Sequence, residues 1–230
     1  MKEKKTILLA IRKNPYSAST KEVLTQHFYN VLMAGTAKAV TSILDQQHPH
    51  LIMVDLNLPG MGGLALIKNL RRSHETHIIA LSHSQDEMIM VDALDAGAND
   101  VLTMPIGSPE HLARIRAALR YSPTTPGCIN GGEFKSQGLY INYSNRTVEV
   151  DGKAIHLTPI EFRIVTLLTI NPGKVLTHDQ IISEIWGPYN SDNLVLRVNM
   201  ANIRRKIEKN PAAPKYILTE VGVGYRAISE

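Results

Sequence analysis

A single carboxylate, Asp55, stands where the chain predicts a strand to end. The apolar run 51–54 precedes it, and Leu-Asn-Leu-Pro-Gly-Met-Gly-Gly follows it. A short apolar run that stops at Pro and Gly is typical of a buried strand leading into a loop. In a parallel sheet, functional groups gather in the loops at the carboxyl ends of the strands. The stretch is therefore expected to present Asp55 at such an end, where a carboxylate could take up a phosphoryl group.

A second set of residues suits contacts with DNA. Residues 193–209 carry apolar residues at intervals of four, three and four, which predicts one buried helix face. Arginine can pair with guanine edges and asparagine with adenine edges, while cations hold phosphates. The segment 197–215 also carries six basic residues against one acid. The expected DNA-binding residues are Arg197, Asn199, Asn202, Arg204, Arg205 and Lys206, with Thr219 and Arg226 from the hairpin that follows. The alternative is a solvated surface helix with ordinary polar residues.

The first 120 residues alternate short apolar runs with amphipathic stretches. This alternation predicts an α/β fold, a doubly wound parallel sheet with helices on both faces. The expected strands are 6–11, 31–34, 51–54, 77–81 and 100–102, and the expected helices are 17–26, 36–46, 63–71, 86–96 and 109–119.

Residues 121–133 are rich in Pro and Gly and lack periodicity, which predicts a linker. The expected organisation is a first domain at 1–120, a linker at 121–133 and a second domain at 134–230.

The second domain carries the signals of a winged helix-turn-helix, an α+β fold. Strands are expected at 139–143, 147–150 and 154–157. Capping boxes at Thr158-Pro-Ile-Glu161 and Thr177-His-Asp-Gln180 open two helices, and the longest helix spans 193–209. A hairpin of 216–219 and 225–228 closes the chain.

The composition fits a water-soluble protein of two domains. Apolar residues make up 43% of the 230 residues and charged residues 20%. No apolar run reaches the roughly 18 residues that span a membrane, so we expect a cytoplasmic protein with no membrane partner. The one cysteine, Cys128, excludes an internal disulfide framework. A linker thiol could form an intersubunit disulfide as a redox sensor, or it could be incidental.

Four longer strings make the whole chain similar to a known family. They are Ile155-His-Leu-Thr-Pro-Ile-Glu-Phe-Arg163, Gly173-Lys-Val-Leu-Thr177, Ile185-Trp-Gly-Pro188 and Gly222-Val-Gly-Tyr-Arg226. With the Asp55 stretch, they resemble the OmpR/PhoB family of bacterial response regulators, and within it the regulators of potassium-transport operons. The resemblance implies a flavodoxin-like (βα)5 receiver domain and a winged-helix effector domain that binds double-stranded DNA.

The resemblance also implies a phosphorylation pocket, and this chain departs from it. Family receivers bind Mg²⁺ through an acidic pair after the first strand, which here is Ile11-Arg12. Their lysine after the fifth strand is Met104 here, their aromatic switch position falls on Val101, and their hydroxyl is kept as Ser82. Asp55 matches the phosphoacceptor. Because Mg²⁺ needs several oxygen ligands, we expect weak or no binding and no other cofactor or metal.

The loss of these groups suggests that the conformation of the receiver is not controlled by phosphorylation. We expect Arg12 to replace the metal by reaching Asp55, where attraction at 4 Å would be roughly 4 kcal/mol before desolvation. Asp55 would then be structural. Alternatively, Arg12 points to solvent and Asp55 keeps slow chemistry as a phosphoacceptor for a sensor histidine kinase.

Family receivers form homodimers through a face held by ion pairs between subunits. Asp100 and Arg114 match one such pair, so we expect a receiver homodimer. RNA polymerase is a further possible partner, through the loop 187–192. A rival from another class is an enzyme or small-molecule binder, but the sequence has no Gly-rich phosphate loop, HExxH or GxSxG motif. We therefore expect no enzymatic activity.

Overall fold

The computed structural model describes residues 4–120, 132–188 and 192–229. The chain divides into two compact units, residues 1–123 and residues 124–230. Within the described ranges, no helix combines the length and the apolar character needed to cross a membrane.

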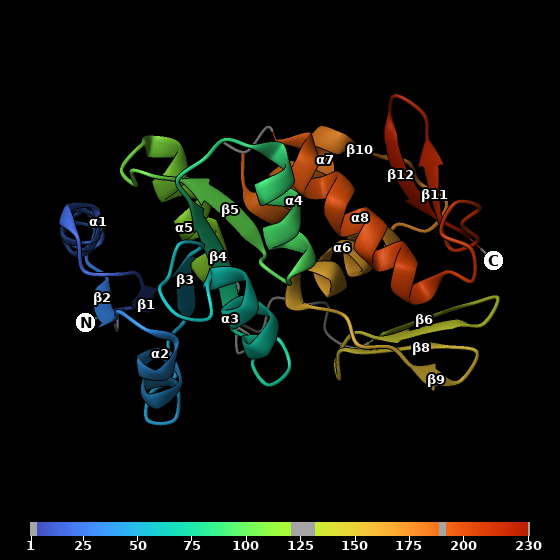
Figure 1. The fold of residues 1–230 in the computed structure, drawn as a ribbon. Helices are drawn as coiled ribbons and strands as arrows, with labels where there is room; N and C mark the ends of the chain where they lie inside the picture. Colours follow the sequence, from blue (N-terminus) through green and yellow to red (C-terminus); the bar gives the residue numbers. More distant parts are fainter. Residues whose placement is uncertain (1–3, 121–131, 189–191, 230) are drawn as a thin grey trace. The chain divides into compact units, whose positions relative to one another are not determined.

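The first unit alternates strands and helices along its whole length (Figure 1). Each apolar run becomes a strand, and each amphipathic stretch becomes a helix. The elements are β1 (Thr6–Ala10), α1 (Pro15–Gln26), β2 (Asn30–Ala34), α2 (Ala37–Leu44), β3 (Leu51–Asp55), α3 (Gly63–Leu70), β4 (His77–Ser82), α4 (Glu87–Asp95), β5 (Asp100–Thr103) and α5 (Pro109–Arg120).

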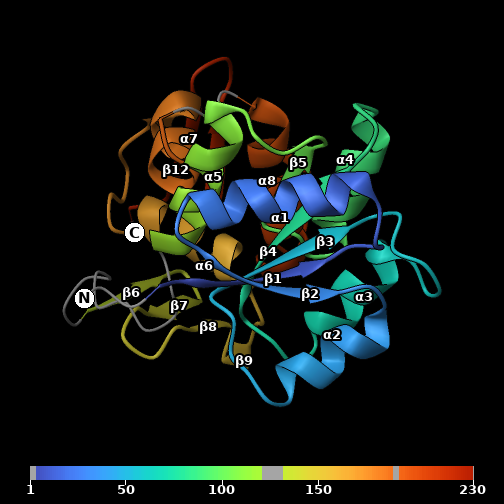
Figure 2. The same ribbon diagram turned by 90° about the vertical axis from the view of Figure 1, so that its left-hand side faces the viewer.

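All five strands pair in parallel, in the order β2-β1-β3-β4-β5. The first unit is thus the doubly wound α/β fold expected from the sequence. Leu24 of α1 and Ile115 of α5 join the same buried cluster as Leu9 and Met53 of the central strands, so these two helices share one face. Helices α2 and α3 lie on the other face (Figure 2). Because β3 is central, Asp55 at its carboxyl end lies between the ends of β1 and β4.

The loop after Asp55 depends on glycine. A Cβ atom added to Gly63 would lie 2.3 Å from the Asp55 carbonyl oxygen, so no larger residue fits there without moving backbone. The backbone N–H of Gly63 also donates to the Leu56 carbonyl at 3.1 Å. The Gly-rich stretch seen in the sequence therefore lets α3 start directly against the end of β3.

The second unit has two sheets around three helices. Its elements are β6 (Glu133–Ser136), β7 (Leu139–Asn142), β8 (Thr147–Val150), β9 (Lys153–Ala154), α6 (Pro159–Thr169), β10 (Leu176–Thr177), α7 (His178–Trp186), α8 (Asn193–Ile207), β11 (Ile217–Glu220) and β12 (Gly224–Ala227). The sheets run β6-β7-β8-β9 and β10-β12-β11. Helices α7 and α8 with the β11–β12 hairpin form the winged helix-turn-helix expected from the sequence (Figure 1).

Both expected capping boxes are present. Thr158 and Glu161 cap α6, and Thr177 and Gln180 cap α7. Two strands were not expected from the sequence. β6 begins at Glu133, the last residue of the expected linker, and β10 is two residues long. Both are recognisable only through their partners, because β6 pairs with β7 and β10 pairs with β12.

Candidate functional site

Asp55 is buried and bonded on both carboxylate oxygens. Its side chain lies at the end of β3, and the residue is 2% exposed. Oδ1 accepts the backbone N–H of Asn57 at 2.8 Å. Nε2 of His83 lies 3.3 Å from Oδ2 and also 3.3 Å from Oδ1. The edge of the His83 ring faces the ring of Tyr16, with the ring centroids 6.1 Å apart. The partner of Asp55 is therefore an imidazole from the neighbouring strand's end.

Arg12 is not that partner. Its side chain is exposed, and the described residues include no ion pair between Arg12 and Asp55. The expectation that Arg12 would occupy the metal position by contacting Asp55 is thus wrong in this structure. The side chain of Ile11 is buried in the core of the first unit. The next residue, Arg12, is exposed to solvent. His83 was missed, although it directly follows Ser82 on the strand beside β3.

The other expected pocket residues are engaged elsewhere. The Ser82 hydroxyl donates to the Ser84 carbonyl at 2.7 Å and accepts the Ser84 backbone N–H at 3.1 Å, which closes a turn in its own loop. Met104 packs, partly buried, against the apolar core of the first unit, and Val101 is buried in β5. The structure places Asp55, Ile11, Ser82 and Met104 at ends of adjacent strands, but joins none of the last three to the carboxylate by a hydrogen bond among the described residues.

These residues do not fit a Mg²⁺ site. The ion needs about six oxygen ligands in octahedral geometry, usually from one or two carboxylates with water. Asp55 is one carboxylate with an imidazole against it, and Ile11 puts hydrocarbon where a second acid would be needed. No group of three or more His, Cys, Asp or Glu side chains suited to a metal is found in the part of the chain that the structure describes.

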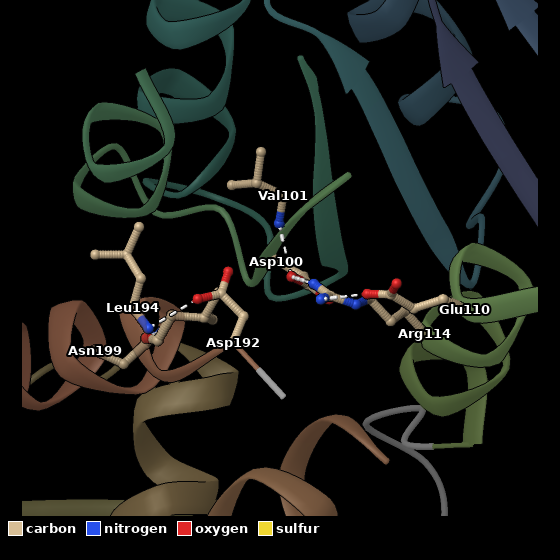
Figure 3. A network of polar contacts seen from close by, with 8 residues as sticks. Asp100, Val101, Glu110, Arg114, Asp192, Leu194 and Asn199 are labelled. Carbon is tan, nitrogen blue, oxygen red and sulfur yellow. Dashed lines mark hydrogen bonds and ion pairs between the residues drawn. The ribbon is translucent and has the colours of Figure 1, made fainter. Parts of the chain in front are cut away.

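Asp100 and Arg114 form an ion pair within one chain (Figure 3). Nη1 of Arg114 lies 3.0 Å from Oδ1 of Asp100, and Nη2 lies 2.7 Å from Oε1 of Glu110. The same Asp100 oxygen accepts the Val101 backbone N–H at 2.8 Å. The sequence had suggested Asp100 and Arg114 for a pair across two subunits. In this structure each already has an opposite charge in its own receiver, because β5 and α5 are adjacent.

Helix α8 begins at a capped position and presents two arginines to solvent. Oδ1 of Asp192 accepts the backbone N–H of Leu194 at 2.8 Å and caps the helix (Figure 3). Leu196, Met200, Ile203 and Ile207 are buried, as the apolar spacing predicts. Arg197 and Arg205 are exposed on the opposite side, with the small Ala201 between them. These two arginines are the exposed cations of the helix that the sequence predicts to contact DNA.

Two expected DNA-binding residues lie away from that face. A helical residue is turned about 100° from the one before it, so Asn199 lies on the side opposite Arg197. Its amide donates to the Val195 carbonyl at 2.8 Å. Nζ of Lys206 lies 2.6 Å from Oε2 of the buried Glu161 in α6. The expectation that Asn199 and Lys206 lie on the same face of α8 as Arg197 is thus wrong. Asn202 is half-buried at the edge of the exposed face.

Two further cations hold the β11–β12 hairpin, here called the wing. Nη2 of Arg204 donates to the Ile217 carbonyl at 2.8 Å and to the Thr219 hydroxyl at 2.7 Å. Arg226 is hydrogen-bonded to Glu220 on the facing strand. The wing tip itself is apolar, a feature the charge pattern did not indicate: Val221 is 91% exposed and Val223 48% exposed.

Comparison with known proteins decides what this arrangement is. Residues 13–116 match the family of response regulator receiver domains, and residues 152–227 match the family of transcriptional regulatory protein C-terminal domains. KdpE of Mycobacterium tuberculosis is 35% identical over 96% of this chain and 98% of its own length. The chain belongs to the OmpR/PhoB family of response regulators. It is a KdpE-like, DNA-binding regulator of the two-component type.

Further likenesses agree with this placement. KdpE of Escherichia coli is 38% identical over 85% of this chain and 84% of its own length. The structure of DrrB, an OmpR/PhoB homolog from Thermotoga maritima, covers 99% of this chain and 100% of its own, at 27% identity and a TM-score of 0.50. A structure of a RitR mutant covers 97% and 98% at a TM-score of 0.74, and its 24% identity shows the shared fold alone. Cys128 lies outside the described residues, so its two interpretations stay open.

Proposed function

We propose that this protein controls transcription by sequence-specific DNA binding, and that its receiver is set without Mg²⁺-dependent phosphorylation of Asp55. The observation that carries the proposal is the set of side chains around Asp55. One imidazole faces both carboxylate oxygens, a hydrocarbon side chain takes the place of a metal ligand, and Met104 takes the place of a cation. Phosphoryl transfer relies on positioned metal and cationic groups to offset the charge of the phosphoryl oxygens.

The bonds of Asp55 add a second reason. The backbone N–H and the imidazole that contact the Asp55 carboxylate stabilise its charge, which makes its oxygens weaker nucleophiles toward a phosphorus atom. Its near-complete burial also limits the approach of a phosphodonor. These features favour a structural role for Asp55 at the junction of β3 and β4.

A conventional regulator, phosphorylated at Asp55 by a sensor histidine kinase, is the second candidate. It is favoured by the kept aspartate, by the Gly63 contact that shapes its loop, and by the likeness to KdpE over most of the chain. The two candidates share the DNA-binding step and differ only in whether phosphorylation of Asp55 controls the receiver.

The partners follow from the effector domain and the family. We propose a homodimer formed through the receiver, acting on DNA in the cytoplasm, with no enzymatic step of its own. Contact with RNA polymerase is proposed for the loop 187–192, of which residues 189–191 lie outside the described residues.

Intact-mass measurement after incubation with Mg²⁺ and acetyl phosphate tests the proposal. The wild-type chain should gain no phosphoryl group. The matched control is the double variant Arg12→Asp with Met104→Lys, which restores an acid and a cation at the ends of β1 and β5. That variant should gain phosphoryl groups faster than the wild type. Stoichiometric phosphorylation of the wild-type chain would overturn the proposal and favour the conventional regulator.

A further inference from the structure

The last turns of α8 hold the outer edge of the wing through two side chains. Arg204 and Glu208 are four residues apart and so lie on the same side of the helix. Oε1 of Glu208 accepts the backbone N–H groups of Tyr216 at 2.9 Å and Ile217 at 3.0 Å, and Oε2 accepts that of Lys215 at 2.8 Å. Both Nε and Nη2 of Arg204 donate to the Ile217 carbonyl, at 3.2 Å and 2.8 Å. Both backbone groups of Ile217 are therefore bonded to α8.

This arrangement satisfies the free edge of a sheet. The strand order β10-β12-β11 leaves β11 at the edge, where backbone N–H and C=O groups lack a neighbouring strand. Edge groups are usually left to water or covered. Here a charged donor and a charged acceptor from one helix replace the missing strand, and hydrogen bonds to charged groups are stronger than neutral ones.

The opposite edge of the wing is fixed as well. A Cβ atom added to Gly224 would lie 1.9 Å from the Leu176 carbonyl oxygen, so β12 runs in close contact with β10. The ring of Tyr225 lies under the Arg204 guanidinium, 5.6 Å from its centroid, and meets the edge of the His178 ring at 5.4 Å. Burial raises the pKa of Tyr225, and the charges of Arg204 and Arg197 oppose that rise. The phenol consequently remains neutral and its ring serves as packing.

Glu208 is the one acid in the basic segment 197–215. A carboxylate beside a DNA-binding face repels phosphates, so its effect through charge alone would weaken DNA binding. Glu208 is nearly buried, and three backbone N–H groups point to its oxygens. The Glu208 carboxylate therefore binds the backbone at the start of the wing and is little exposed to solvent.

We propose that Arg204 and Glu208 are positioning residues that fix the wing to the recognition helix α8, so that both reach DNA as one preorganised surface. The proposal rests on DNA binding by the effector domain. A wing that moved independently would have to be ordered on binding, at an entropic cost that lowers affinity. Arg204, expected from the sequence to contact DNA, acts instead through Ile217, Thr219 and Tyr225.

The substitution Glu208→Gln gives a test in which charge and positioning predict opposite results. Loss of a negative charge alone should tighten DNA binding. Loss of the wing's anchor should weaken it, by about tenfold, because a glutamine amide has one acceptor oxygen where the carboxylate has two, and its NH2 group must face at least one of the three N–H groups of residues 215–217. The measurement is affinity, by fluorescence anisotropy of the full chain, for a duplex that the wild-type chain has selected from a randomised pool. Glu184→Gln, at an exposed acid of α7, is the matched control and should bind as the wild type does.

Arg204→Lys is the milder second variant, since lysine keeps the charge but cannot span Ile217 and Thr219 together. Its affinity should fall severalfold, while the slope of log affinity against log salt stays unchanged because no phosphate contact is lost. Amide hydrogen exchange should speed up in residues 215–220 of both variants and stay unchanged in β7 and β8, which shows that the domain remains folded.

The outcomes separate the two levels of inference. Glu208→Gln binding as tightly as the wild type or more tightly, with wing exchange unchanged, overturns the positioning role. Unchanged affinity together with unchanged wing exchange in Arg204→Lys overturns it too, because the wing would then not depend on the guanidinium contacts to Ile217 and Thr219. A wild-type chain that selects no duplex would instead contradict the proposed sequence-specific binding itself.

Discussion

Three buried carboxylates show how single residues are used in this chain. Asp55 holds the Asn57 backbone N–H and His83, Glu208 holds the start of the wing, and Glu161 holds the start of α6. A buried acid is costly unless donors surround it. Asp55 and Glu161 each have donors from two different segments, and Glu208 has three donors from the segment 215–217. Each acid therefore joins parts of the fold that are separate in sequence.

Glu161 carries a prediction about stability. Its Oε2 accepts the Thr158 backbone N–H at 2.6 Å and lies 2.6 Å from Nζ of Lys206. Glu161→Ala removes the cap and the ion pair and should cost about 2 kcal/mol of unfolding free energy. Glu161→Gln keeps an acceptor for the cap and should cost about 1 kcal/mol or less, because a partly exposed lysine pairs weakly. Urea unfolding followed by fluorescence of Trp186, the chain's only tryptophan, measures both. Equal losses for the two variants would contradict the capping role.

The basic residues of the recognition helix α8 point in different directions and have different surroundings. Along α8, Arg197 and Arg205 face solvent, Arg204 faces the wing, and Lys206 faces α6. All four are cations in the sequence, and their angular positions on the helix separate the exposed ones from those bonded to the wing or to α6.

Salt dependence distinguishes these roles. Arg197→Ala removes an exposed cation and should lower DNA affinity severalfold, with the slope of log affinity against log salt reduced by about one. Lys206→Met removes a cation that is bonded to Glu161 and should leave the slope unchanged. Titrations of the selected duplex at several salt concentrations compare the two variants. A slope that falls in Lys206→Met but not in Arg197→Ala would reverse the assignment of this helix's faces.

At the scale of the whole molecule, the proposed homodimer is best tested at an exposed charge and not at Asp100. Asp100 is bonded to Arg114 of its own receiver, so substituting it would disturb the monomer as well as a dimer. Asp92 is exposed on α4, which contacts β5, the strand that carries Asp100, and we take this side of the receiver as the proposed dimer face.

Asp92→Arg should therefore shift the protein toward monomer in sedimentation velocity over a range of protein concentrations. Exposed ion pairs contribute only about 0–1 kcal/mol each, so the shift should be severalfold in the dimer dissociation constant and not a complete loss. Asp45→Arg, at the exposed end of α2, is the control and should sediment as the wild type does. A wild-type chain that stays monomeric at every concentration would contradict the dimer, and an unchanged Asp92→Arg dimer would move it to another face.

Much of the architecture could be predicted because it rests on local signals. Apolar runs and their spacing placed the five parallel strands, and capping boxes placed the starts of α6 and α7. The short strands β6 and β10 escaped prediction, since each forms only by pairing with a strand that lies elsewhere in the sequence.

The sequence by itself determined that Asp55 ends a strand and that a basic helix precedes a hairpin, because both follow from residue types and their periodicity, which are local. The resemblance to the family adds that Ile11 and Met104 replace the family's usual groups. Only the tertiary structure decided that His83 and not Arg12 faces Asp55, and that Arg204 and Glu208 hold the wing. The reason is physical: partners of buried polar groups come from elements distant in sequence, and the direction of each side chain is set by how those elements pack.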